Sequence, residues 1–174
     1  MKIVLLIPFL TLLTFAVEVK IPISFKANFT QKITNPKKKI IKYSGSILLD
    51  DSGAFKWIYK TPTKKEVCSN GKDFLVVDHD LEQVSFYRLN KSLNLLEVLK
   101  NAKHHKDNLF VASYQKKNYT FSIDKKGQID QIAYRDDLEN IVNIHFIKMH
   151  YSDKSISKKR LECQYPNSYD MIQG

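Results

Sequence analysis

Apolar and polar residues alternate along most of this chain, a pattern that suits extended strands with one buried face. In the run from Phe25 to Ile33, every second residue belongs to a mostly apolar set and the residues between are polar. The same alternation marks Ile41 to Leu49, Phe55 to Tyr59 and Tyr119 to Ile123. Strands are therefore the dominant element that this sequence predicts.

Further strand-like runs bring the expected total to about eleven, close to the number at which a single sheet must curl. Two of these runs lie between Val67 and Val77, one on each side of Asn70-Gly71. The others are Val84 to Arg88, Leu109 to Gln115, Ile129 to Tyr134, Ile141 to His150 and Leu161 to Tyr165. Asn70-Gly71 tolerates positive φ at both positions and predicts a tight hairpin turn. We expect a mainly β (α+β) fold with a strongly curved antiparallel sheet.

Helical periodicity is confined to one segment, from about Leu93 to Lys103. Leu95, Leu96, Val98 and Leu99 recur at helical spacing, and Asn94 with Glu97 could form a capping box. The adjacent residues His104 and His105 would point in different directions on a helix. They are read more simply as solvated histidines at the helix end than as a metal site.

The first sixteen residues resemble a cleavable export signal. Lys2 precedes an apolar stretch from Ile3 to Phe15, and Thr14 and Ala16 occupy the small-residue positions before a cut. A retained membrane anchor is the alternative, but this stretch is shorter than the roughly 20 residues that span a bilayer. We expect residues 1–16 to be removed and residues 17–174 to form a single domain, with no cysteine at Val17 for lipid attachment.

The chain is basic, with a formal net charge of +10 that becomes +9 once Lys2 is removed. Such a surplus could attract anionic membranes, acidic partners or nucleic acid. The lysines stand in short clusters between apolar segments, which is typical of solvated turns and strand ends. Because the protein is expected to be exported, nucleic acid is not an expected partner.

Cys68 and Cys163 are the two cysteines of the chain. In an oxidising compartment they are expected to form a disulfide, with two buried free thiols as the alternative. A bridge that closes so long a loop would contribute about 4 to 5 kcal/mol if the chain-entropy account holds.

Sequence signatures of enzymes are missing from this chain. It has no glycine-rich phosphate loop, no G-x-S-x-G segment and no paired His-x-x-x-His. We expect no catalytic residues, cofactor or metal, although a hydrolase with a site assembled from distant residues is a rival interpretation. The abundance of large apolar side chains fits either an ordinary β core or a cavity for an apolar ligand.

Several motifs, in order and spacing, resemble the outer-membrane lipoprotein carrier family, LolA. The opening strand FKANFTQKI carries Phe25, Ala27, Phe29 and Gln31, and Gly45 follows. The remaining matches are the segments FKWIYKTP with Phe55, Trp57, Tyr59 and Pro62, CSNGK with Ser69, Gly71 and Lys72, VVDHDLEQV with Asp78, Asp80, Leu81, Gln83 and Val84, and finally Pro166 and Asp170. The resemblance extends over nearly the whole mature chain.

This resemblance implies an incomplete β-barrel with a helical lid, acting as a chaperone in the periplasm of a Gram-negative bacterium. It would bind the acyl chains of lipoproteins released by an inner-membrane ABC transporter complex and deliver them to an outer-membrane acceptor where one is present. We expect a monomer. A lipid- or glycolipid-binding or sensor module on the same scaffold is the alternative.

The expected cavity and lid residues are apolar. They are Ile47, Leu49, Phe55, Trp57, Tyr59, Phe74, Phe86, Leu95, Leu96 and Leu99. Phe55 is favoured for the cavity mouth.

Three departures from the family pattern concern the lid. Asp51 and Ser52 stand where the family usually carries an Arg-Pro pair that latches the lid, so Lys56 is the candidate replacement donor. Only eight residues separate the expected cut from Phe25, which leaves an N-terminal lid helix short or absent. The expected helix near Leu93 also lacks the Thr-Pro start that is common in relatives.

Overall fold

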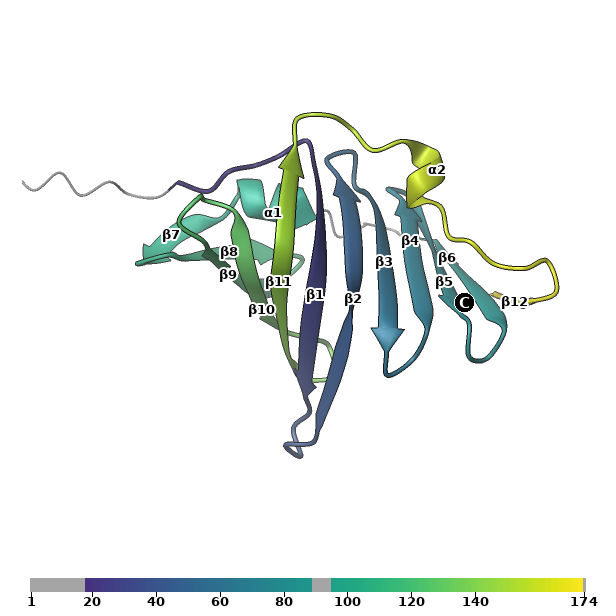
Figure 1. Cartoon of the computed structure of the whole chain (residues 1–174). Coiled ribbons are helices and arrows are strands. Elements are labelled where there is room, and N and C mark those ends of the chain that lie inside the picture. The colour runs from purple at the N-terminus through teal and green to yellow at the C-terminus, as the bar shows by residue number, and fades with distance from the viewer. Residues whose placement is uncertain (1–17, 89–94, 174) are drawn as a thin grey trace, which may run out of the picture.

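One twelve-stranded sheet forms the body of the protein, in a computed structural model that describes residues 18–88 and 95–173 (Figure 1). The strands are β1 (Ser24–Thr34), β2 (Ile40–Asp50), β3 (Ala54–Thr61), β4 (Lys65–Asn70), β5 (Asp73–Asp78), β6 (Gln83–Arg88), β7 (Lys103–Lys106), β8 (Leu109–Tyr114), β9 (Lys117–Ile123), β10 (Ile129–Arg135), β11 (Ile141–Ser152) and β12 (Asp170–Gln173). The helices are α1 (Leu95–Lys100) and α2 (Lys158–Leu161). The expected curved, mainly antiparallel sheet is confirmed.

The strand order is β12-β6-β5-β4-β3-β2-β1-β11-β10-β9-β8-β7, and β12 alone pairs in parallel, with β6. The first strand therefore lies in the middle, between its sequence neighbour β2 and the late strand β11. Because β6 lies near one edge and β7 forms the other, the connection that contains α1 must pass across the sheet. The sheet curls, and α1 lies on its inner side (Figure 1).

Alternation assigns each strand residue to the inner (concave) or the outer (convex) face. Phe25, Ala27 and Phe29 of β1 are at most 4% exposed, whereas the intervening Lys26 and Thr30 are exposed. Apolar residues from α1 and from β1, β2, β8, β9, β10 and β11 join these residues in one buried cluster. The main core therefore lies on the concave face.

The tight hairpin turn predicted at Asn70-Gly71 is confirmed, although Gly71 and not Asn70 has positive φ. Gly71 has φ of 90°, and the Asn70 side-chain oxygen accepts hydrogen bonds from the backbone N–H groups of Lys72 and Asp73, at 2.8 and 2.9 Å. The turn joins β4 and β5 as an antiparallel hairpin.

Two local predictions are wrong. The expected helix to Lys103 ends at Lys100, because Lys103 to Lys106 pair with β8 as the edge strand β7. His104 and His105 are therefore exposed strand residues; the expected start of the helix at residues 93 and 94 lies outside the described part of the chain, as do residues 1–16.

The strand expected at Leu161 to Tyr165 is absent. Leu161 ends α2, and Cys163 lies in a non-regular segment that its disulfide holds against β4. The C-terminal strand is instead β12, which begins at Asp170. The loss of one expected strand and the presence of β7 and β12 account for twelve strands in place of about eleven.

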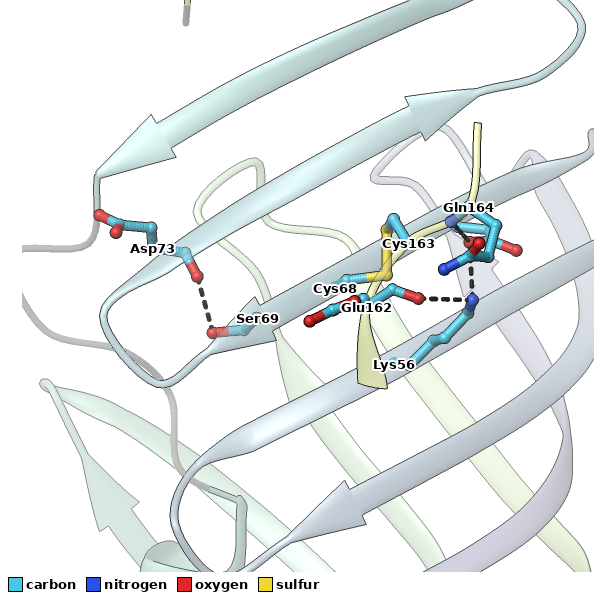
Figure 2. The surroundings of a disulfide bond; sticks show 8 residues. Lys56, Cys68, Ser69, Asp73, Glu162, Cys163 and Gln164 are labelled. Atoms are coloured by element: carbon cyan, nitrogen blue, oxygen red, sulfur yellow. Dashed lines mark hydrogen bonds and ion pairs between the residues drawn. A yellow bond between two sulfur atoms is a disulfide. The ribbon is translucent and has the colours of Figure 1, made fainter. Parts of the chain in front are cut away.

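A C-terminal strap, residues 156–165, covers the convex face of β3 and β4 (Figures 1 and 2). Cys163 bonds to Cys68, and the carboxylate of Asp50 accepts a hydrogen bond from the backbone N–H of Ile156 at 2.8 Å. The bridge lies in a second, smaller apolar cluster with Val77 and Val84. The strap thus closes a face that would otherwise expose apolar strand residues.

Gly45 permits a close approach between β2, β3 and the Phe29 ring. A β-carbon at this position would collide with the backbone carbonyl oxygen of Ile58 and lie 3.0 Å from the Phe29 ring. The backbone of β3 cannot withdraw without breaking its pairing with β2. We therefore expect Gly45→Ala to lower the free energy of unfolding by about 1 to 3 kcal/mol in urea denaturation, as overpacking does.

The matched control is Ser46→Ala, at the next residue of the same strand, which is half-buried and points to the other face. It should change the free energy of unfolding much less. Equal effects of the two substitutions would contradict this account of Gly45.

The disulfide closes a loop with a sequence separation of 95. Replacing both cysteines, as Cys68→Ser with Cys163→Ser, should lower the free energy of unfolding by about 4 to 5 kcal/mol in the chain-entropy account. Urea denaturation with and without a thiol reductant measures this loss. The reductant should destabilise the natural chain and leave the double variant unchanged; no effect on the natural chain would contradict a structural bridge.

Candidate functional site

The concave face carries a continuous row of aromatic side chains at its centre. The ring of Phe29 packs edge-on against Trp57 and Tyr59, with ring centroids 4.9 and 5.3 Å apart. Tyr43 contacts Tyr59 at 5.7 Å, and Phe146 of β11 contacts Trp57 at 6.4 Å. Strand register explains the row, because Phe29 pairs with Gly45 and Gly45 pairs with Tyr59, so that the ring lies over a residue without a side chain.

Helix α1 covers one part of this face. Leu95, Leu96, Val98 and Leu99 are all at most 7% exposed and belong to the main core cluster. In a helix of six residues, these four leave only Glu97 and Lys100 to face water. The helix is therefore held chiefly by apolar burial.

Toward β6 the same face is less completely buried. Phe55, Trp57 and Tyr59 of β3 are half-buried. By contrast, Leu49 and Ile47, the β2 partners of Phe55 and Trp57, are at most 3% exposed. The concave face continues along this region with further half-buried side chains: Val67, Phe74, Val76 and Tyr87. These residues form an apolar surface beside α1 that retains access to solvent, which we call the open apolar surface.

Nine of the ten predicted cavity and lid residues share the concave face. Phe86 lies on the convex face instead. It pairs with Leu75 of β5, and Leu75 pairs on its other side with Cys68 of β4, which points to the convex face. Its sequence neighbour Tyr87 occupies the concave position and stacks on Phe74 at 4.7 Å. The prediction for Phe86 is wrong because Phe74 to Val77 is apolar at every position, so alternation could not identify the inner face there.

Sequence reasoning also omitted Phe29 and Phe146 from the site, although both contact Trp57. Phe29 carried a signal, since it belongs to the most regular alternating run. Phe146 could be placed beside Trp57 only through the pairing of β1 with β11, which joins residues 117 positions apart at Phe29 and Phe146.

Lys56 is not a lid latch. Its side chain points to the convex face, away from α1, where its ammonium donates to the backbone oxygen of Glu162 at 2.8 Å and pairs with the carboxylate of Glu66 at 2.9 Å (Figure 2). The same carboxylate accepts the backbone N–H of Gln164 at 3.0 Å. Lys56 alternates with Phe55 and Trp57, so it must face away from them, and it fastens the strap.

Two further expectations concerned the lid. Residues 18–23, which precede β1, contain no helix. Asp51 and Ser52 form the turn between β2 and β3, in which the Ser52 hydroxyl donates to the carboxylate of Asp50 at 2.7 Å.

One group of potential metal ligands occurs among the described residues, formed by Glu66, Cys68 and Cys163. The disulfide occupies both sulfur atoms, so neither cysteine offers a thiolate. Residues 18–88 and 95–173 include no helix long and apolar enough to cross a membrane.

Burial on the concave face raises the pKa values of tyrosines there. It raises the pKa of Tyr134 and of Tyr151 to about 12, and it raises the pKa of Tyr59 well above its usual range. All three hydroxyls are therefore neutral under physiological conditions. The face presents apolar groups and neutral hydroxyls, a composition that suits hydrocarbon better than a charged ligand.

Comparison with known proteins identifies one family. Residues 23–135 match the family described as outer membrane lipoprotein carrier protein LolA. The outer-membrane lipoprotein carrier protein of Campylobacter jejuni is 36% identical over 149 residues, 86% of each chain, and that of Wolinella succinogenes is 28% identical over 71% of this chain and 72% of its own.

Among solved structures, an uncharacterized conserved protein from Thermus thermophilus resembles this chain with a TM-score of 0.53. It is 7% identical, and the alignment covers 87% of this chain and 90% of that one. At this identity the likeness concerns the fold alone.

The raised pKa values of Tyr59, Tyr134 and Tyr151 predict a loss of stability in alkali. The unfolded chain releases these protons near pH 10, whereas the folded chain holds them to about pH 12 or above. The free energy of unfolding should therefore be unaffected by them below pH 10 and fall as the pH rises from 10 to 12. Urea denaturation at a series of pH values measures the slope.

Tyr134→Phe removes one of these ionisations and should make the alkaline slope shallower. A slope that is the same in the variant, or a free energy that does not fall above pH 10, would contradict the buried state of these hydroxyls.

Proposed function

Because the chain belongs to the outer membrane lipoprotein carrier protein family, we propose that it carries acylated lipoproteins between membranes, with their acyl chains held on the open apolar surface beside α1. The observation that supports this role most directly is the run of half-buried apolar residues on the concave face, adjoining a core that is otherwise almost completely buried. The part of the lipoprotein that contacts this surface would be the hydrocarbon of its acyl chains.

The physical need for such a carrier follows from the cost of exposing acyl chains to water. Each CH₂ group contributes about 0.8 kcal/mol, so a lipoprotein with several acyl chains faces a penalty in the tens of kcal/mol. A carrier does not need extreme affinity to overcome this barrier. The chains exchange one apolar environment for another, and moderate binding permits both loading and release.

We propose that α1 is the lid of this site. Leu95, Leu96 and Leu99 pack on the concave face, and acyl chains could replace their contacts at little net cost. Burying one such side chain contributes about 1.5 to 3 kcal/mol. With Asp51 and Ser52 in place of the family's Arg-Pro pair, apolar burial would hold the lid closed.

The proposal extends to the route of the cargo. The chain would be exported to the periplasm of a Gram-negative bacterium by the signal in residues 1–16, receive lipoproteins from an inner-membrane ABC transporter complex and pass them to the outer membrane, through an acceptor where one is present. It would act as a monomer. No bond is made or broken in this role, so it needs neither catalytic residues nor a cofactor.

Phe55 tests the proposed site. Its side chain is half-buried on the concave face near the start of β3, so a charged residue there should be tolerated by the fold but should repel hydrocarbon. In a host depleted of its own copy, Phe55→Glu should leave lipoproteins in the inner membrane, whereas the natural chain restores their transfer. Membrane fractionation followed by lipoprotein detection measures the distribution.

Two controls define the result. Phe55→Leu keeps an apolar side chain and should support transfer. Lys60→Glu, at an exposed position of the same strand, should do so too. Circular dichroism of the purified variants establishes that each is folded. Normal transfer by folded Phe55→Glu would rule out the proposed position of the acyl chains, and unchanged sorting in the depleted host would rule out the carrier role.

A further inference from the structure

The convex face of the three central strands is organised in rows that run across the sheet. At the end of β1 nearest the β1–β2 hairpin, Thr34 pairs with Ile40 of β2 and with Ile141 of β11. Ile40 is 51% exposed and Ile141 44%. The neighbouring Ile41 pairs with Ile33 and so points to the concave face, where it is 48% exposed. Large aliphatic side chains therefore meet water on both sides of this end of the sheet, where the hairpin projects beyond the other strands (Figure 1).

The next row on this face is basic. Lys32 lies directly opposite Lys42 across the β1–β2 pair, an arrangement of like charges that destabilises a sheet. Within residues 18–88 and 95–173, no carboxylate lies at salt-bridge distance from either ammonium. The hairpin adds the exposed run of residues 37–39, all lysines. Five lysines thus surround the isoleucines.

A depression of about 420 Å³ adjoins the basic row. Both lysines line it, together with His145 and with uncharged hydrogen-bonding side chains: Thr30, Ser44, Thr61, Gln131 and Asn143. The hydroxyls of Ser44 and Thr61 lie 2.7 Å apart and share a hydrogen bond. The lining therefore offers several donors to an anion that the lysines attract.

The carboxylates nearest this end of the sheet have other partners. Asp130 lies 3.2 Å from the His145 ring, and in the β10–β11 turn Asp137 pairs with Lys117 and Glu139 with Arg135. These groups reduce the net charge of the surroundings, but they leave Lys32 and Lys42 without a neutralising partner among the described residues. The positive charge is available to a ligand outside the chain.

We propose that this end of the sheet docks reversibly on a bilayer that contains anionic phospholipid. As this end inserts, Ile40 and Ile141 enter the headgroup region from the convex side and Ile41 from the concave side, and the lysines contact the phosphates above them. The order of aliphatic side chains, then ammonium groups, then neutral donors matches the order of acyl boundary, phosphate and water across a bilayer surface. A nucleic acid would offer phosphates to the lysines but no hydrocarbon layer to the exposed isoleucines, so a bilayer fits this surface better.

The docking surface is separate from the proposed cargo site. It lies on the convex face and the hairpin end, whereas the open apolar surface lies on the concave face of β3 to β6. A carrier that visits membranes would gain from a brief stay on their surface, but the inference stands on this surface alone and does not require the carrier role.

Sedimentation with lipid vesicles tests the proposal. The chain without residues 1–16 should bind vesicles of phosphatidylcholine with phosphatidylglycerol, bind those of phosphatidylcholine alone far less, and be released by salt. Each lysine near an anionic surface changes the binding constant roughly fivefold, so Lys32→Glu with Lys42→Glu should weaken binding by at least roughly tenfold. Ile40→Ser with Ile141→Ser should weaken it several-fold at unchanged charge.

The matched control is Lys125→Glu with Lys126→Glu. These exposed lysines lie in the turn between β9 and β10, at the opposite end of the strands, and their reversal changes the net charge by the same amount. The control should keep most of the binding. Should reversal of the Lys32 and Lys42 charges prevent folding, Lys32→Gln with Lys42→Gln measures the same loss with a smaller electrostatic change.

Three outcomes would overturn the proposal: no binding of the natural chain to anionic vesicles at low salt, equal loss in the Lys125 and Lys126 control, or full binding by the isoleucine variant. Either of the last two results would mean that the net charge of the chain, and not this surface, explains its binding to vesicles. The vesicles hold no lipoprotein, so a negative result leaves the carrier role open, and failure of the Phe55 test leaves the docking surface open.

Discussion

The pairing of β1 with β2 on one side and with β11 on the other determines how the rest of the sheet is arranged. Its register places Phe25, Ala27 and Phe29 on the concave face. Because side chains alternate with a period of two, a slip by one residue would expose this set and bury lysines instead. The central strand thus determines which face of its neighbours meets the core, and Gly45 makes room for the Phe29 ring.

The two faces of the curled sheet are covered in different ways: the convex face by the strap and the concave face by α1. On the convex face, the strap is held by a disulfide and by the Lys56–Glu66 pair, which makes that cover permanent. On the concave face, α1 is held mainly by leucine and valine side chains. Only the second kind of cover can be exchanged for a hydrocarbon ligand without breaking a covalent bond or exposing a buried charge.

Much of the site could be predicted where the sequence pattern is strictly alternating. Phe55, Trp57 and Tyr59 reach the concave face as expected, because each is separated from the next by one residue directed outward. Phe86 was misplaced since β5 is apolar on both faces, one side meeting the concave surface and the other the strap cluster. The expected Cys68–Cys163 disulfide, which the structure confirms, linked the strap to β4. The strap carries no alternation, however, so the local pattern did not show which face it covers or that it engages Lys56.

The sequence by itself determined the strand-rich, curved architecture, the Asn70-Gly71 turn and the resemblance to the carrier family, because these depend on residue spacing along the chain. Tertiary structure alone decided which late strand flanks β1, how the connection through α1 crosses the sheet, and which side of β6 faces inward. Such features depend on contacts between residues that are distant in sequence. The long-range pairing of β1 with β11 aligns Ile141 with Ile40 across Thr34, whereas the β1–β2 hairpin places Lys32 opposite Lys42. The two rows meet at one end of the sheet only in the folded protein.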